Sequence, residues 1–450
     1  MEKVKLNYAR DILASVENEK LADPVAAMYK SGRTILRHGT VIDPKNGVQG
    51  QKDIAWSGDT ILEMADEIQP ERGDRVIECE GLLVFPGLID MHLHMHDLFE
   101  VSTDPIYHAA EDGVAVGFTP GAGNTLIGPA LLGAEVDRGL PINVGMYLGA
   151  ASLMSTKMST EDWISFFKGT LPADVAFEKA TLNFFANTCG NLIMGIKDHM
   201  GHFLLSDEDL EAVYEITSKA NLLFMSHTQD PFRAEHVVSL SKGRPVHLGH
   251  VDVAGCGSHG EAEESMKMVL ELCKQPQVTG EVISTFMRIG RGSRESLFIP
   301  RDSQKLVYDA LHDGTINIMI SDGDNDGTIK GGGDTRDNIP AILELAQQEV
   351  LTLPQAVALM TSNVADLFAK RCQNPWFTEK LGHLGAGAYA NITVVDPDDR
   401  MATYTIVNGE ISGFENRVVR KNVGCGKWIS KAGAVDNMGV GELSMFSYWK

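Results

Sequence analysis

The chain contains 450 residues, of which 43% are hydrophobic and 22% are charged. This length suits about three ordinary domains, or one barrel with a small added domain, and the composition excludes a disordered or low-complexity chain. The 39 lysines and arginines against 61 aspartates and glutamates leave a formal charge of −22. That charge repels phosphate groups, so nucleic acid and anionic membranes are excluded as expected partners.

The sequence shows no segment for crossing a membrane and no signal for export. No uninterrupted apolar stretch approaches the ~20 residues that a membrane span needs, and the N-terminal segment lacks the apolar centre of a signal peptide. We therefore expect a cytoplasmic protein. The six cysteines are scattered without a C-x-x-C pair, which argues against a disulfide framework or a thiolate zinc site. Any metal must then be bound by histidine, lysine or carboxylate side chains.

The two ends of the chain share one texture. Residues 1–32 carry apolar positions at helical spacing and predict an N-terminal helical extension. Residues 33–86 then form short β-type runs separated by Gly, Asn and Asp, and residues 383–430 repeat this pattern. We expect these two segments to pair into one small β-sandwich domain, followed by a C-terminal tail over residues 431–450.

Residues 87–382 alternate short apolar runs with helical stretches. The runs are VGMYLGA, NLIMGIK, LLFMSHT, RPVHLGHV, QVTGEVI and INIMISD. One of the helical stretches opens with Ser206 and Asp209 as a capping box. Repeated strand and helix units over this length predict an α/β fold, a (β/α)₈ TIM barrel. A doubly wound sheet is the alternative, but no G-x-G-x-x-G follows the first strand, and the ligand-type residues end many different strands.

The first barrel strand ends in a histidine pair within GLIDMHLHMH. His92 and His94 are two residues apart, so on a strand both imidazoles point the same way and can face one metal ion. A buried structural role is the ordinary alternative for a single histidine, but it is less expected for a pair at this spacing. His96 continues the series where the strand should turn into a loop.

Later strand ends add one candidate each. Lys197 ends an apolar run, where an uncompensated ammonium is costly, so its amine either reaches solvent or is carbamylated by CO₂ to an anionic group. His227 follows another apolar run. His247 and His250 are three residues apart and point to opposite strand faces, so only one can be a ligand, and we favour His250 because it lies nearer the strand end. Asp322 should end the eighth strand, where a carboxylate can bind metal and accept a proton.

One competing motif overlaps Asp322. Asp322, Asp324, Asp326 and Gly327 match the first half of an EF-hand calcium loop, but the twelfth position is Gly333 and the preceding segment is expected to be a strand. We therefore reject a calcium loop.

The assembled pattern resembles the amidohydrolase superfamily, in the branch that includes dihydroorotase, hydantoinase, deacetylases and isoaspartyl peptidases. The resemblance covers about residues 33–412 and is carried by PGLID-H-H at 86–94, GIK at 195–197, VTGEV at 278–282, ALMTSNVADLF at 358–368 and GHLGAGAYANITVVD at 382–396. It departs from dihydroorotase after His94, where the expected arginine is replaced by Met95.

This resemblance implies a metal-dependent hydrolase that cleaves a C–N amide bond in a cyclic amide, an imide or an N-acyl substrate. It implies two divalent ions, zinc first, with manganese or iron as alternatives, and a CO₂-derived carbamate on Lys197 that bridges them. His92, His94 and Asp322 would bind one ion, and His227 and His250 the other. A metal-bridging hydroxide would attack, with Asp322 as the catalytic general base and then acid.

Two other functions stay open from the sequence. A hydrolytic deaminase of an aminoheterocycle with a mononuclear site typically has Glu three residues after the fifth-strand histidine, and Asp230 stands there instead. A non-catalytic scaffold of the same fold is the remote alternative, although every proposed ligand is intact.

The expected partner is a small-molecule amide substrate, and the family favours homo-oligomers, dimers or tetramers. Arginines beside a metal suit a carboxylate-bearing substrate, because a guanidinium binds carboxylate through two hydrogen bonds. The candidate substrate-binding residues are His199, Arg288, Arg291 and Asn325, with His202, Arg294 and Arg336 as further candidates.

Overall fold

The computed structural model describes residues 32–95, 104–120, 124–199, 204–292, 297–323, 332–419 and 424–440. The expected N-terminal extension lies outside these residues except for Gly32. Within the described part of the chain, no helix is both long and apolar enough to cross a membrane.

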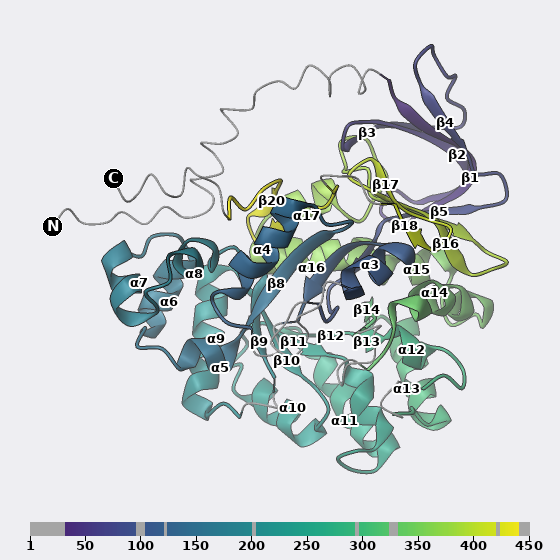
Figure 1. Cartoon of the computed structure of the whole chain (residues 1–450). Helices are drawn as coiled ribbons and strands as arrows, with labels where there is room; N and C mark the ends of the chain where they lie inside the picture. Colours follow the sequence, from purple (N-terminus) through teal and green to yellow (C-terminus); the bar gives the residue numbers. More distant parts are fainter. Residues whose placement is uncertain are drawn as a thin grey trace, which may run out of the picture.

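The centre of the molecule is a barrel of parallel strands (Figure 1). Its strands in chain order are β6 (Leu88–Asp90), β7 (Val114–Thr119), β8 (Asn143–Gly149), β9 (Gly195–Asp198), β10 (Leu223–His227), β11 (Val246–Gly249), β12 (Val278–Gly280) with β13 (Val282–Ile283), and β14 (Met319–Ile320). Neighbouring strands pair in sequence order, and a parallel bridge between Leu93 and Gly323 joins the last strand to the first. The expected TIM barrel is therefore confirmed.

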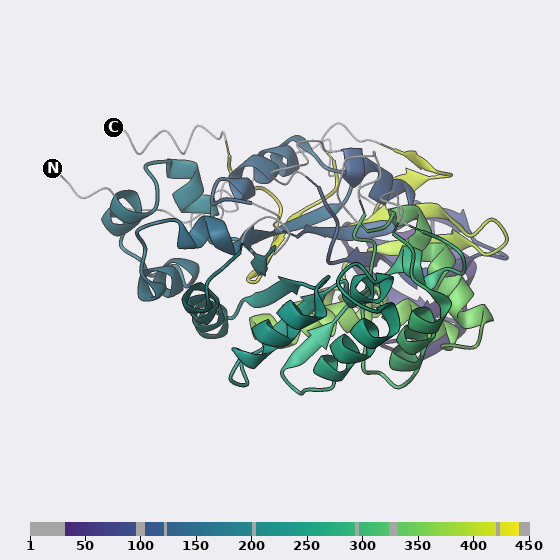
Figure 2. The same ribbon diagram turned by 90° about the horizontal axis from the view of Figure 1, so that it is seen from below.

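Helices follow the barrel strands and surround them (Figures 1 and 2). They are α3 (Asp104–Glu111), α4 (Gly128–Arg138), α5 (Ala150–Met154), α6 (Thr160–Phe167), α7 (Ala173–Lys179), α8 (Phe184–Cys189), α9 (Asp207–Ala220), α10 (Pro231–Ser239), η1 (Val251–Cys256), α11 (Ala262–Cys273), α12 (Ser284–Met287), α13 (Arg301–His312), η2 (Thr335–Asp337), α14 (Asn338–Gln347), α15 (Leu353–Ala358), α16 (Ser362–Cys372) and α17 (Trp376–Lys380). The predicted capping box of Ser206 and Asp209 begins α9. Apolar strand and helix residues from all around the barrel form one continuous buried core.

A second sheet combines both ends of the chain, as expected. It contains β1 (Thr34–Asp43), β2 (Val48–Ser57), β3 (Thr60–Ala65), β4 (Arg75–Glu78), β5 (Leu83–Pro86), β15 (Ile392–Asp396), β16 (Met401–Val407), β17 (Glu410–Phe414) and β18 (Arg417–Val418). The antiparallel pair of β5 and β15 joins the two ends, and all nine strands form one continuous sheet with its own apolar core. In both views this sheet lies at one side of the barrel (Figures 1 and 2).

The segment after this sheet departs from the expected boundary. The sequence predicts a β domain that extends to residue 430 and a tail after it, but β19 (Trp428–Ser430) pairs with the barrel strand β8 and forms a hairpin with β20 (Gly433–Val435). The buried indole of Trp428 explains this, because its Nε1 donates to the Leu192 carbonyl at 2.9 Å beside the barrel. Residues 441–450 lie outside the described residues.

Candidate metal centre

The carboxyl ends of the barrel strands bring the predicted ligands together. His92 and His94 follow β6, Lys197 lies on β9, and His227 ends β10. His250 directly follows the end of β11, and Asp322 lies two residues after the end of β14. Parallel strands in a barrel present their carboxyl ends at one face, where barrel enzymes hold their reactive groups.

His92, His94 and Asp322 form a compact group that could hold a metal ion. One ligand atom from each lies within 4.8 Å of the others, and all three residues are buried. Asp322 Oδ1 is 3.1 Å from His92 Nε2 and 3.2 Å from His94 Nε2. The other oxygen, Oδ2, accepts the Gly332 backbone N–H at 2.5 Å. Asp322 therefore presents a single oxygen to the histidines, and the backbone holds the other.

The charge state of Asp322 follows from its neighbours. Burial alone would raise the pKa of its carboxyl, but the imidazoles of His92, His250 and His94 hold that pKa well below its usual range. The residue is therefore an ionised acceptor, as a metal ligand or a base requires.

Lys197, His227 and His250 extend the cluster. Lys197 is fully buried, and its Nζ lies 2.7 Å from His92 Nε2. The ring of His250 lies 4.5 Å from the ring of His227 and 5.2 Å from that of His92, between ring centroids. Both His227 nitrogens and His250 Nδ1 are buried with no hydrogen-bond partner among the described residues. Unpaired buried nitrogens are costly, and a bound cation would satisfy them.

The two imidazoles of this second group are neutral. Burial lowers the pKa of His227 well below its usual value and lowers that of His250 to about 3. Neutral imidazole is the form that binds metal.

The structure separates His247 from His250. Both ring nitrogens of His247 are used, because Nδ1 lies 2.9 Å from Thr279 Oγ1 and Nε2 lies 3.0 Å from Glu281 Oε2. His250 is instead turned toward the cluster. Strand β11 ends at Gly249, and His250 has left-handed backbone with φ of 39°, so the expected alternation of faces does not extend to it.

Two buried carboxylates outside the predicted ligand set, Asp90 and Glu281, contact residues of the cluster. Asp90 accepts backbone N–H groups from His92 and Ser321, each at 3.2 Å, and so joins the first and last strands. Glu281, between β12 and β13, hydrogen-bonds His92 Nδ1. The VTGEV run contains Glu281, but the sequence indicates no role for this residue, because its only signal there is a lone acidic side chain inside a buried strand.

The predicted substrate-binding arginines are engaged elsewhere. Arg288 forms ion pairs with Asp337 and Glu344, and Arg291 Nε lies 3.2 Å from Asp337. The structure thus pairs both guanidinium groups with protein carboxylates. Arg336 likewise pairs with Asp334. Asn325, His96, His202, Arg294 and the acidic residues of the rejected calcium loop after Asp322 lie outside the described residues.

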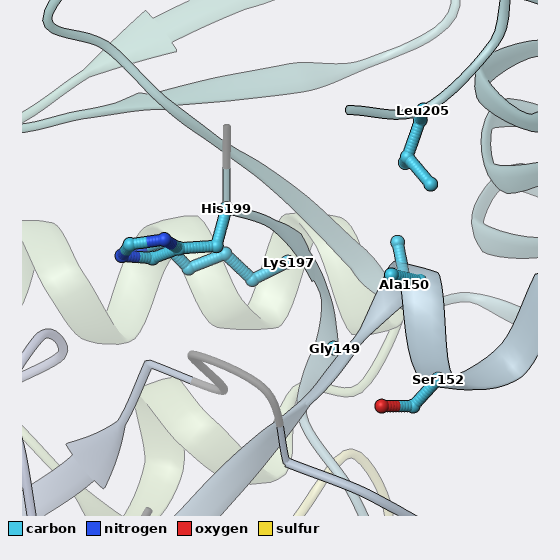
Figure 3. Close-up of a pocket in the computed structure, with 7 residues that line it drawn as sticks. Gly149, Ala150, Ser152, Lys197, His199 and Leu205 are labelled. Carbon is cyan, nitrogen blue, oxygen red and sulfur yellow. The ribbon is translucent and has the colours of Figure 1, made fainter. Parts of the chain in front are cut away.

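His199 lies beside the cluster. Its ring centroid is 4.8 Å from that of His227, and it lines a pocket with Lys197, Leu205 and the start of α5. Figure 3 shows Lys197 and His199 extending to the same side of this pocket, with Ala150 and Ser152 of α5 opposite Leu205. Asp230, which stands at the position of the deaminase glutamate, caps α10 instead, because its carboxylate accepts the backbone N–H groups of Phe232 and Arg233.

Comparisons with known proteins agree with this architecture. The model of the amidohydrolase family matches residues 83–422. The chain is 22% identical over 431 residues to a dihydroorotase of Geobacter metallireducens, covering 83% of this chain and 91% of the relative. It is 35% identical over 86 residues to a dihydroorotase of Streptococcus thermophilus, covering 19% of this chain and 20% of the relative.

Among solved structures, a D-hydantoinase superposes with a TM-score of 0.68 at 17% identity, covering 89% of this chain and all of that chain. A dihydropyrimidinase from Brevibacillus agri gives a TM-score of 0.63 at 15% identity, covering 89% of this chain and 99% of that chain. These similarities agree with the barrel and the added β domain.

Proposed function

Because the chain belongs to the amidohydrolase family, we propose that it hydrolyses the C–N bond of a cyclic amide with divalent metal ions held at the carboxyl ends of its barrel strands. The observation that carries the proposal is the buried group of His92, His94 and Asp322, with Lys197 Nζ 2.7 Å from His92 Nε2. The names of the relatives support a ring substrate, because dihydroorotase, hydantoinase and dihydropyrimidinase each name a cyclic amide.

Six residues would hold two ions. His92, His94 and Asp322 would bind the first, and His227 and His250 the second, with Lys197, as a carbamate, between them. The donor set fits, since it combines neutral imidazoles, an ionised carboxylate and ring nitrogens that have no hydrogen-bond partner among the described residues. Imidazole and carboxylate suit zinc, and manganese or iron are the alternatives.

Asp322 is the proposed proton carrier. Cations held by these side chains would lower the pKa of an attacking water and polarise the substrate carbonyl. Asp322 Oδ1 faces the space beside His92 and His94, while Gly332 holds Oδ2 in place. A carboxylate fixed in this way accepts a proton from the nucleophile and returns it to the leaving nitrogen without changing its position.

His199 is the proposed substrate contact from the described residues, because it lines the pocket beside Lys197. Arg288 and Arg291 are weaker candidates for a carboxylate-bearing substrate, since both already pair with Asp337.

The capping role of Asp230 argues against the deaminase alternative, which needs an acidic residue at the reaction centre. We also propose that the protein is cytoplasmic and forms a dimer or tetramer, and light scattering would test the oligomeric state.

The test is a substrate screen on protein whose metal content has been measured. Purified protein loaded with zinc, manganese or iron in the presence of bicarbonate would be offered dihydroorotate, hydantoins, dihydropyrimidines, β-aspartyl dipeptides and N-acyl amino acids. We expect ring opening of at least one cyclic amide, which would be detected as a loss of ring absorbance and by mass spectrometry. Ammonia release from aminoheterocycles would favour the deaminase, and an intact protein that binds no metal would favour the scaffold.

A further inference from the structure

Glu281 is a fully buried carboxylate at the break between β12 and β13. The carboxylate receives three hydrogen bonds: from His92 Nδ1, from His247 Nε2 at 3.0 Å, and from the His250 backbone N–H at 3.3 Å. A buried carboxylate is retained only where its oxygens are well paired, and these donors satisfy both of them.

The contact with His92 fixes which ring nitrogen carries the proton. An ionised carboxylate can only accept, so His92 must donate from Nδ1–H, which leaves the lone pair of Nε2 free. Nε2 is the atom that lies 3.1 Å from Asp322 Oδ1 and 2.7 Å from Lys197 Nζ. Glu281 therefore directs the metal-binding nitrogen of His92 into the cluster.

The same carboxylate oxygen holds the backbone at His250. Glu281 Oε1 receives both His92 Nδ1–H and the His250 N–H. The left-handed backbone of His250 is strained for a residue with a side chain, at about 1–3 kcal/mol, and persists only where its surroundings hold it. One oxygen thus joins a side chain of the first proposed ion position to the backbone of the second.

His247 anchors Glu281 on its other side. Its Nε2–H donates to Oε2, so its Nδ1 accepts the hydroxyl proton of Thr279 at 2.9 Å. Thr279 in turn lies 3.5 Å from Arg371 Nη2 on α16. This series of contacts leads from α16 through β12 and β11 to Glu281 and restrains the carboxylate from moving.

We propose that Glu281 is a positioning residue that couples the two metal positions, by fixing the tautomer of His92 and the backbone of His250 through one oxygen. This inference rests on the proposed function, because it concerns the same ions. It predicts that a substitution at Glu281 lowers the affinity for both ions together, although Glu281 contacts neither of them.

The test compares Glu281→Gln with the wild-type protein in metal binding. The glutamine has the same shape but offers one oxygen and one N–H₂ group, so it cannot accept from both His92 and His247 in their present tautomers. We expect both affinities, measured by competition with a chromophoric chelator, to fall by about 10- to 100-fold. The absorption bands of bound Co²⁺ should also change, a readout independent of turnover.

Asp53→Asn is the matched control. Asp53 is a buried carboxylate in the β domain that accepts the N–H groups of Ile68 and His38 and pairs with Arg37. Its loss should lower thermal stability while leaving both metal affinities and the Co²⁺ spectrum unchanged. If Glu281→Gln does not fold, Glu281→Asp replaces it, because it keeps the charge but withdraws both oxygens by one methylene.

The outcomes separate this inference from the proposed function. Wild-type protein that binds two ions, with Glu281 variants of unchanged affinity and spectrum, would overturn the inference alone. Weakening of one ion without the other would overturn the coupling. Wild-type protein that binds no ion pair would overturn both the inference and the proposed function.

Discussion

Replacement of Asp322 by asparagine tests whether both carboxylate oxygens are needed, one for the backbone and one for the proposed cation. Oδ2 accepts the Gly332 N–H at 2.5 Å, and Oδ1 faces His92 and His94. An amide has only one oxygen. If that oxygen stays with Gly332, the N–H₂ group points toward the proposed cation, and if it turns to the cation, two N–H donors face each other.

The expected loss of metal affinity follows from the second arrangement, in which the amide oxygen faces the cation and the Gly332 N–H loses its acceptor. A buried backbone donor left without an acceptor costs about 1–3 kcal/mol. At 1.4 kcal/mol for each tenfold change, this corresponds to metal binding weakened by about 5- to 150-fold at the position of His92 and His94. At saturating metal, turnover should fall further, by about 10²- to 10⁴-fold, because an amide cannot carry the proton.

The assay is a chelator competition for affinity, followed by turnover of any substrate found in the screen at saturating metal. Asp334→Asn is the control, because Asp334 is a buried carboxylate that accepts from the Arg336 backbone and pairs with the Arg336 side chain. Wild-type metal affinity in Asp322→Asn would refute the argument that Gly332 competes for the amide oxygen. Turnover that is unchanged at saturating metal would refute the proton-carrying role.

Three further predictions concern separate parts of the molecule. If Lys197 carries the proposed carbamate, Lys197→Ala should lose the second proposed ion, as measured by metal analysis, and added acetate should restore part of it, because a free carboxylate can replace a carbamate. Burial raises the pKa of Asp112 to about 7, so the folded state holds a proton that the unfolded chain releases near ~3.9, and wild-type stability falls as pH rises between these values. The free energy of unfolding of Asp112→Asn, relative to that of the wild type, should therefore be higher at pH 8 than at pH 5, as measured by urea unfolding. A difference that is the same at pH 5 and pH 8 would contradict this. Gly333→Ala would place a Cβ 2.3 Å from the Ser321 carbonyl oxygen, so unfolding should show a loss of about 1–3 kcal/mol.

The convergence of the ligand residues could be predicted because it depends on topology alone. Once the alternating runs indicate a barrel, residues that end different strands must meet at one face, whatever the details of packing. His92, His227 and Asp322 are predicted to converge in this way, and the structure brings them into one cluster. The choice of His250 over His247 also followed from position along the strand, although the physical reason was a left-handed turn that no sequence pattern indicated.

The partners of polar side chains could not be predicted. Arg288 and Arg291 follow the seventh strand, as substrate-binding residues would, but Asp337 from another segment neutralises them. Glu281 shows the converse, since its role depends on histidines 189 and 34 residues away in sequence. Such contacts depend on side-chain geometry across strands, which hydrophobic periodicity does not encode.

Backbone contacts, and not the metal alone, maintain the geometry of the proposed site. His250 and Asp322 both have left-handed backbone, with φ of 39° and 48°, one residue after β11 and two residues after β14. Each such residue costs about 1–3 kcal/mol. Near both residues, a carboxylate accepts a backbone N–H: Glu281 from His250, and Asp322 itself from Gly332. A hydrogen bond to a charged group contributes about 1.5–3 kcal/mol, which is enough to offset the strain. The protein itself therefore holds the proposed ligand atoms in place, so an ion that binds there would not have to order the site.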